Sequence, residues 1–293
     1  MSDEPRRAVL RTEGRRASRR TLVVVLLLAT TAIIGTGTAL VMRMTGETPR
    51  KPAAHGEQGF APFEPRFAEG GLVTNEFAFL HPRNRHARVS RDWIATSGSL
   101  FAKDGAGWTG VPDVGDTGAD SARHTDSAVF RLVSRRRDFG AVTVSVRSRL
   151  QPPVTTPKTP ARDWDGGHIW LRYHSPEELY AISFRRRDGA VVIKRKIPGF
   201  GPEDEDTGGY ATLAEGRHAI SYDAWHRVSA SAANLPSGSV RLRLDIDGKT
   251  VLTAEDRTPG PLRRPGGVGL RADNTELLFA GFRAVPAPTP TSG

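Results

Sequence analysis

Apolar and polar residues alternate over much of the second half of the chain, most regularly between Trp164 and Lys196. Such alternation is typical of β-strands that bury one face. In the first predicted strand, residues 167–173, one face carries Ile169, Leu171 and Tyr173. The opposite face carries His168, Trp170 and Arg172. The alternative is that Trp170 belongs to the core and that the two faces are reversed.

The next two segments predict a hairpin. Residues 178–187 lead to Asp188-Gly189, which is typical of a two-residue turn, and a third strand follows to Lys196. Such a turn would place Phe184 opposite Ile193 and Ser183 opposite Lys194. The predicted apolar face then contains Tyr180, Ile182, Phe184, Val191 and Ile193. The reverse face is basic and contains Arg185, Arg187, Lys194 and Lys196.

Further short strands are predicted on both sides of this stretch, at residues 127–132, 141–150, 225–231, 240–246, 250–254, 267–271 and 276–285. Asp247-Gly248 predicts a second hairpin turn. No amphipathic helix of useful length follows residue 50, so the apolar faces must be buried by another sheet. The sequence therefore predicts an all-β antiparallel sandwich over residues 71–285.

The N-terminal part of the chain has a different composition. Residues 1–20 are basic, and residues 21–42 are apolar without a charge, which is long enough for one transmembrane helix. The basic flank predicts a signal-anchor that spans the cell membrane, with the N-terminus on the inner side and residues 43 onward on the outer side. A cleaved secretory signal and a twin-arginine export signal at Ser18–Leu22 are alternatives. Residues 43–70 are expected to be a flexible linker, and residues 286–293 a disordered tail.

Charge and cysteine content limit the partners. The net charge is +10 and stays at +6 without residues 1–20, which favours acidic partners, although a GC-rich coding sequence would also enrich arginine. Cysteine is absent, so an exported domain must rely on its core, and thiolate metal clusters are excluded. No nucleic-acid recognition motif is present, and nucleic acid is not an expected partner.

Several motifs together resemble the concanavalin A-like lectin/glucanase superfamily, which includes laminin G-like modules and 3-keto-glycoside hydrolases. They are Trp164-Asp165-Gly166, the Ile169–Tyr173 strand, the Arg-Arg-Arg-Asp-Gly run ending at Gly189, Asp247-Gly248, and Gly267–Arg271 followed by Asp273-Asn274. The resemblance covers about residues 75–285 and implies a jelly roll whose concave face recognises a glycan.

The resulting hypothesis is a membrane-anchored extracellular domain that binds an acidic polysaccharide or cell-wall glycan. Trp170 would support a sugar ring, and arginine forks would bind carboxylates. The predicted ligand-binding residues are His168, Trp170, Arg172, Arg185, Arg187, Lys194 and Lys196. For the four cations on the hairpin, the alternative is that they lie on a solvated sheet face and bind no ligand. The acidic run at residues 203–206 would then neutralise their charge.

Two other functional classes stay open. A glycoside hydrolase would need aligned carboxylates that no strand shows, whereas a polysaccharide lyase could use His168, Arg172 and Tyr210. A laminin G-like adhesion module would need no sugar. No cofactor is expected, although Asp245, Asp247, Asp273 and Asn274 could join a calcium site. Trp93, Trp108, Trp164 and Trp225 are expected to be packing residues.

Overall fold

The computed structural model describes residues 59–67, 70–112, 128–157, 159–198 and 209–288. These residues belong to one compact unit, residues 54–293. The predicted basic tail, the apolar segment at residues 21–42 and the acidic run at residues 203–206 lie outside the described residues. Among the residues that are described, no helix is long and apolar enough to cross a membrane.

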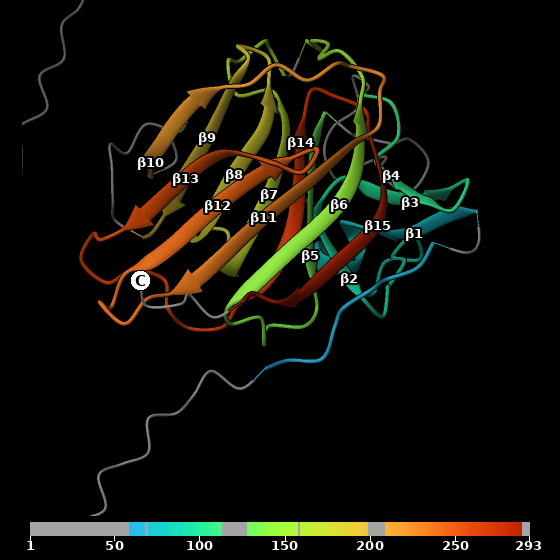
Figure 1. The fold of residues 1–293 in the computed structure, drawn as a ribbon. Coiled ribbons are helices and arrows are strands. Elements are labelled where there is room, and N and C mark those ends of the chain that lie inside the picture. Colours follow the sequence, from blue (N-terminus) through green and yellow to red (C-terminus); the bar gives the residue numbers. More distant parts are fainter. Residues whose placement is uncertain (1–58, 68–69, 113–127, 158, 199–208, 289–293) are drawn as a thin grey trace, which may run out of the picture. The chain divides into compact units, whose positions relative to one another are not determined.

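Two antiparallel sheets make up the described part of the chain (Figure 1). Within it, the eight-stranded sheet, which we call the back sheet, has the order β1 (Gly71–Asn75), β3 (Ser99–Lys103), β4 (Ala106–Trp108), β15 (Leu277–Pro286), β6 (Val142–Leu150), β11 (His226–Asn234), β12 (Val240–Ile246) and β13 (Lys249–Asp256). The seven described strands of the front sheet have the order β10 (Tyr210–Arg217), β9 (Ala190–Lys196), β8 (Glu178–Arg186), β7 (Gly166–Ser175), β14 (Gly267–Asp273), β5 (Val129–Ser134) and β2 (Trp93–Ser97). One short helix, α1 (Phe77–Leu80), follows β1 in this described region.

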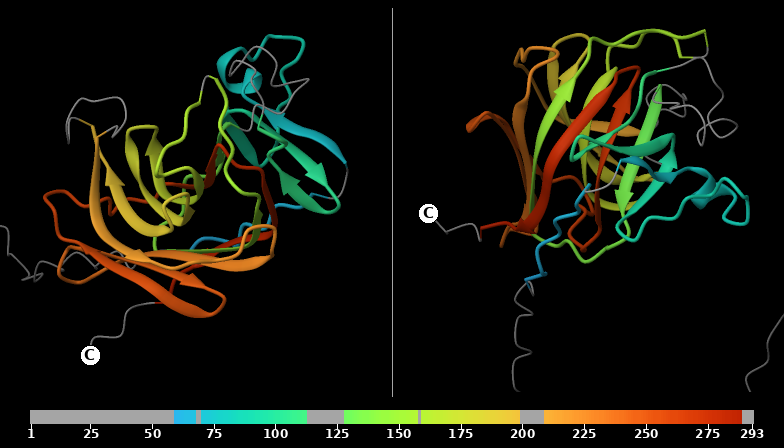
Figure 2. Two further views of the ribbon diagram at one scale, coloured as in Figure 1. Left: turned by 90° about the horizontal axis from the view of Figure 1, so that it is seen from above. Right: turned by 90° about the vertical axis from the view of Figure 1, so that its right-hand side faces the viewer.

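The core lies between the two sheets, which Figure 2 (left) shows edge-on with the yellow strands above the orange ones. The predicted apolar face of the hairpin is buried in this core, as are Val142, Val144 and Val146 of β6. Along β6 the buried residues alternate with more exposed ones, as a period of two requires. The predicted all-β antiparallel sandwich is therefore confirmed.

The two predicted Asp-Gly turns differ in geometry. Asp247 and Gly248 both have positive φ, and Ile246 pairs with Lys249, so this is the predicted two-residue turn. In the other hairpin, Gly189 N–H donates to Arg186 O at 3.1 Å, and Arg187 and Asp188 occupy the turn. Ile182 therefore faces Ile193 and Ser183 faces Val192, two residues away from the predicted register. Because the shift is even, each strand keeps the predicted face toward the core.

A β-bulge in β7 corrects the predicted faces of that strand. The pairing of β7 with β8 is interrupted between Leu171 and Ser175, and Arg172 has φ 51°. The extra residue turns Arg172 inward beside Leu171 and brings Tyr173 to the outer face with Trp170. The Arg172 side chain is 0% exposed and donates to Asn234 Oδ1 at 3.1 Å and to Leu262 O at 2.9 Å. The expectation that Arg172 lies beside Trp170 and His168 was wrong.

A second bulge, in β8, corrects the predicted basic face. Gly167 pairs with Arg185 but His168 pairs with Ser183, so Phe184 is the extra residue. Arg185 accordingly lies over the Tyr222 ring at 4.0 Å, away from Lys194. The neighbouring Arg186 takes the outer-face position, where its charge acts on His168 and Lys194.

The segment before β1 also contributes to the core. Phe63 and Phe67 are buried, and the backbone of Phe63 exchanges two hydrogen bonds of 3.0 Å with Ala284 of β15. Both residues fall within the predicted flexible linker, residues 43–70. The folded part of the chain therefore begins before the predicted boundary at residue 71, because aromatic side chains in this segment fill the end of the sandwich.

Candidate functional site

The outer face of the front sheet has an apolar half. Val133, Trp170, Tyr173, Leu179 and Ala181 form a buried cluster there, separate from the main core. The rings of Trp170 and Tyr173 stack at 5.5 Å with an interplanar angle of 14°, and Trp170 is 3% exposed. Trp170 thus lies on the predicted face but is covered by its neighbours, so it does not present an open platform to a sugar ring.

The other half of the outer face is polar and centres on His168. His168 Nδ1 lies 2.8 Å from Ser183 Oγ on β8, and His168 Nε2 lies 3.4 Å from Asp273 Oδ2 on β14. Arg271 Nε donates to the same Asp273 oxygen at 2.6 Å. Four side chains from three adjacent strands therefore form one connected group, and His168, Ser183 and Asp273 are buried within it.

Burial and charge set the protonation states of this group. Burial alone would raise the pKa of Asp273, but Arg271 and His168 outweigh it and hold the pKa at about 2. Burial lowers the pKa of His168 below its ordinary value of 6.5, against the attraction of Asp273. At neutral pH the group therefore contains a carboxylate, a guanidinium and a neutral imidazole.

Replacing His168 by Gln is expected to reduce the acid sensitivity of the domain. Because its folded-state pKa is lowered, wild-type His168 takes up a proton in the unfolded chain before it does in the folded one. The contribution of His168 to the free energy of unfolding is therefore complete above pH 6.5. It decreases as the pH falls below 6.5, by up to about 1.4 kcal/mol per pH unit. Urea unfolding at pH 7 and pH 5 measures the difference. The exposed control, His81→Gln, should keep the wild-type dependence, and an unchanged slope in His168→Gln would contradict the assignment.

Two arginines face each other beside this group. Arg131 of β5 is the direct cross-strand partner of Arg271 of β14, and both side chains are partly exposed on the outer face. Directly opposed like charges are destabilising unless an anion lies near. Asp273 forms an ion pair with Arg271, whereas the Arg131 guanidinium has no hydrogen bond or ion pair with another described residue. Burial and then the charge of Arg271 lower the pKa of Arg131.

Tyr210 and two lysines complete the polar half. The hydroxyl of Tyr210, on β10, lies 3.5 Å from Arg271 Nη1. Arg271, and not the predicted Arg172, is therefore the arginine that Tyr210 contacts. The ammonium groups of Lys194 and Lys196 lie 5.8 and 5.1 Å from the Tyr210 ring. Lys196 pairs with Glu177 at 3.1 Å, whereas Lys194 has no carboxylate within ion-pair distance among the described residues.

A cleft opens at the end of this polar half. Its volume is about 220 Å³, and Arg131, Arg271 and Asp273 line its floor. The loop before β7 forms its wall with Thr159, Pro160, Arg162 and Trp164. Trp164 was expected to be a packing residue, but it is partly exposed in the cleft wall with the Arg162 guanidinium 5.7 Å from its ring. No local pattern predicts this position for Trp164, because the loop reaches the cleft only through tertiary contacts.

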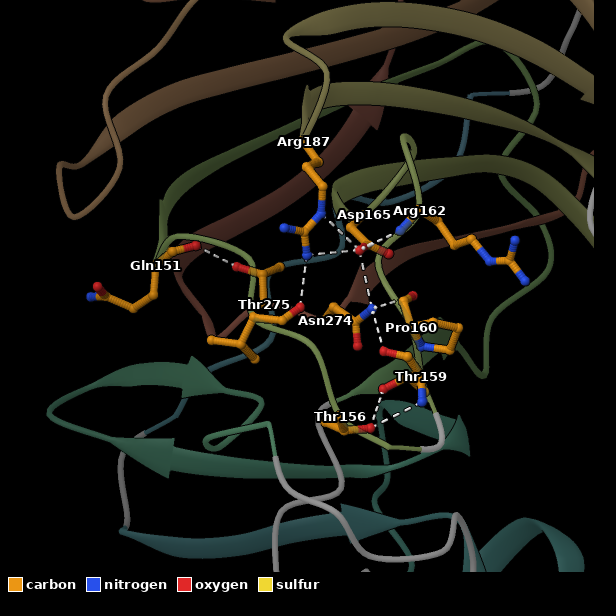
Figure 3. Close-up of polar contacts among 10 residues, drawn as sticks. Gln151, Thr156, Thr159, Pro160, Arg162, Asp165, Arg187, Asn274 and Thr275 are labelled. Carbon is orange, nitrogen blue, oxygen red and sulfur yellow. Dashed lines mark hydrogen bonds and ion pairs between the residues drawn. The ribbon is translucent and has the colours of Figure 1, made fainter.

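Buried polar contacts fix the loop in place (Figure 3). Asp165 Oδ2 accepts hydrogen bonds from Arg187 Nε at 3.0 Å, from Asn274 Nδ2 at 3.1 Å and from the backbone N–H of Arg162 at 3.0 Å. The Asn274 amide also donates to the carbonyl oxygens of Thr159 and Pro160. Arg187 therefore neutralises a buried carboxylate behind the cleft wall, away from the ligand-facing side where it was predicted.

The possible calcium ligands do not converge. Asp245 pairs with Arg243 at 2.7 Å and Asp247 with His226 at 2.8 Å, both on the back sheet. Asp273 and Asn274 lie at the end of β14 with partners of their own. In the described ranges, no three His, Asp or Glu side chains are grouped so that they could hold a metal ion.

Comparisons with known proteins give structural matches alone. No protein-family model matches the chain, and no curated protein matches it. A carbohydrate-binding module, CBM66 from Bacillus subtilis, superposes with a TM-score of 0.44 at 12% identity, covering 65% of this chain and 94% of that one. A B. subtilis protein of unknown function with a galectin-like fold gives a TM-score of 0.45 at 15% identity, covering 68% and 91%. A structure from work on endo-acting O-glycanases of the human gut microbiota gives 0.48 at 10%, covering 77% and 99%.

All three matches have sequence identities of 15% or less. With TM-scores below 0.5, they carry no argument about the ligand or activity of this chain.

Proposed function

We propose that the domain binds an acidic polysaccharide in the cleft at the polar end of the front sheet. The observation that carries the proposal is the direct pairing of Arg131 with Arg271 on a partly buried surface. Asp273 forms an ion pair with Arg271, whereas Arg131 forms none with another described residue. A carboxylate or sulfate group between the two guanidiniums would relieve their repulsion and accept forked hydrogen bonds.

The cleft wall fits a sugar next to that anion. Trp164 offers an aromatic surface with a polar N–H, a combination that suits the apolar face and hydroxyl edge of a sugar ring. The loop that carries it is held by Asp165 and Asn274, so the wall is already ordered without a ligand. Preorganisation of this kind lowers the entropic cost of binding.

Arg131→Gln tests this proposal, because it removes a cation that forms no ion pair with another described residue. The substitution therefore breaks no such pair in the fold. The dissociation constant for sodium polygalacturonate or alginate is expected to rise roughly 10–150-fold, the equivalent of about 1.5–3 kcal/mol for a hydrogen bond to a charged group. Isothermal titration or affinity electrophoresis with the domain, residues 54–293, measures it. Binding by the wild type is also expected to weaken as salt is raised.

Arg241→Gln is the matched control, since it removes one exposed cation from the back sheet. It should bind the polymer as the wild type does. Equal losses in the two variants would show that net charge and not the cleft governs binding. No binding by the wild type to any acidic or neutral polysaccharide would overturn the proposal and favour an adhesion module.

An eliminating lyase is the second candidate, favoured by the contact between the Tyr210 hydroxyl and Arg271. Burial raises the pKa of Tyr210, so the hydroxyl stays protonated and could donate its proton to the departing sugar oxygen. A base would take the proton from C5 of a uronate as the C4–O bond breaks, and a C4=C5 double bond would remain. Ultraviolet detection of unsaturated ends in the same incubations, with Tyr210→Phe as the comparison, separates an enzyme from a binding module.

For the location of the domain, we propose display on the outer side of a cell membrane, supported by the basic segment at residues 1–20 and the apolar segment at residues 21–42. Protease added to intact cells should then degrade the domain, whereas a cytoplasmic marker stays intact. Recovery of the domain in the soluble fraction of the culture would instead indicate a cleaved signal.

A further inference from the structure

A second surface, made of residues that do not line the cleft, combines exposed apolar side chains with arginines. Residues 77–91, which comprise α1 and the turns after it, contain four arginines and no acidic residue, and we call this segment the basic knob. Phe79, Leu80 and Val89 within it are 48%, 50% and 62% exposed, among the most exposed large apolar side chains of the described residues. Figure 2 shows α1, in cyan, at the periphery of the unit beside β1.

The basic knob is firmly attached to the domain. Asn75 of β1 donates from Nδ2 to His86 O at 2.7 Å, and its Oδ1 accepts from Arg88 N–H at 3.0 Å. Thr74 Oγ1 donates to Arg88 O at 2.8 Å, and Phe77 is buried beneath the segment. Exposed apolar side chains on such an ordered segment are a fixed feature of the surface, and patches of this kind mark interaction sites.

Most arginines on this surface have no acidic partner among the described residues. Arg91 pairs with Asp92 at 3.2 Å, whereas Arg83, Arg85 and Arg88 have no carboxylate within ion-pair distance among the described residues. A shallow groove of about 290 Å³ lies between the basic knob and β1. Two arginines, Arg66 and Arg88, line it together with the apolar residues Phe67, Leu72, Val73 and Val89.

We infer that the basic knob docks on an anionic phospholipid surface. Phe79 and Leu80 enter the headgroup region, and the arginines bind lipid phosphates, as in interfacial segments that combine apolar and basic side chains. The proposed anchor supports this partner over others. At most 16 residues separate the predicted span from Gly59, and an extended chain of that length reaches roughly 60 Å, so the domain would stay close to the bilayer.

Vesicle sedimentation tests the inference with the domain, residues 54–293, which is one compact unit with its own core. The domain should sediment with vesicles of equal phosphatidylcholine and phosphatidylglycerol and stay in solution with phosphatidylcholine alone. Arg83→Gln with Arg85→Gln should weaken vesicle binding roughly 30-fold, from the loss of two arginines near an anionic surface. Phe79→Ser with Leu80→Ser should weaken it as well, because both side chains are exposed and leave the core unchanged.

The matched control is Arg227→Gln with Arg241→Gln, which removes two exposed cations from the back sheet. Full vesicle binding by the control supports docking through the basic knob, whereas equal losses in both double variants overturn it. Failure of the wild type to sediment with anionic vesicles also overturns the inference. So does a result in which Arg83 and Arg85 bind an acidic polymer but the domain does not bind vesicles. Arg131→Gln should bind vesicles as the wild type does. A failure of the glycan proposal can therefore be distinguished from a failure of the membrane inference.

Discussion

Replacing Asp256 by Ala is expected to destabilise the domain by about 3–5 kcal/mol, because it leaves a buried arginine without its counterion. Asp256, at the end of β13, and Arg195, on β9, are both buried and form an ion pair of 3.3 Å that joins the two sheets. The Tyr180 hydroxyl donates to the same carboxylate at 2.6 Å, and Arg195 also donates to carbonyl oxygens of Pro259 and Gly260. Loss of the carboxylate therefore affects both sheets and the loop after β13.

Urea unfolding at neutral pH measures this effect, with Asp245→Ala as the control. Asp245 pairs with Arg243 on a solvent-exposed strand face, and pairs of that kind contribute about 0–1 kcal/mol. Asp256→Asn separates charge from shape, since it keeps the size of the side chain and one oxygen acceptor. A loss below about 1 kcal/mol in Asp256→Ala would show that the ion pair does not stabilise the junction between the sheets.

The second large effect is expected for Phe63→Ala, at about 3–5 kcal/mol. The Phe63 ring makes edge or tilted contacts with Trp93, Phe139 and Phe282, with centroid distances of 5.3, 5.7 and 6.1 Å. Removing it opens a cavity between residues that cannot all move inward, because each belongs to a different part of the sandwich. The segment around residue 63, outside the predicted domain, is thus a structural part of it.

Thermal or urea unfolding of the same domain measures the loss, and Phe79→Ala provides the same substitution at an exposed position. That control should change stability by no more than about 0.5 kcal/mol. A domain that begins at residue 71 should lose at least as much as Phe63→Ala. Wild-type stability in the shortened domain would show that residues 59–67 contact the core without stabilising it.

Much of the local structure was predictable because its causes lie close together in the chain. The period of two along β6, β8 and β9 determined which residues face the core, and an even register shift at Asp188-Gly189 left that result unchanged. Asp247-Gly248 fixed its own turn, since both residues tolerate positive φ. The need to bury one face of each strand without helices then required a second sheet.

The candidate site depended on contacts that no local pattern contains. One bulge in β7 moved Arg172 from the predicted site into the interior, and another in β8 exchanged Arg185 for Arg186. A bulge inserts a residue and so reverses the alternation beyond it, while the composition of the strand stays the same.

The sequence by itself determined the fold class, the core-facing residues of β6, β8 and β9 and the presence of the two hairpins, because side-chain alternation and turn preferences are local properties. Only the tertiary structure decided that Arg131 faces Arg271, that Trp164 lines the cleft and that Arg187 neutralises Asp165 behind it. These groups come from segments far apart in the sequence, and strand order and bulges bring them together. The binding surface therefore became visible only when the sheet was assembled.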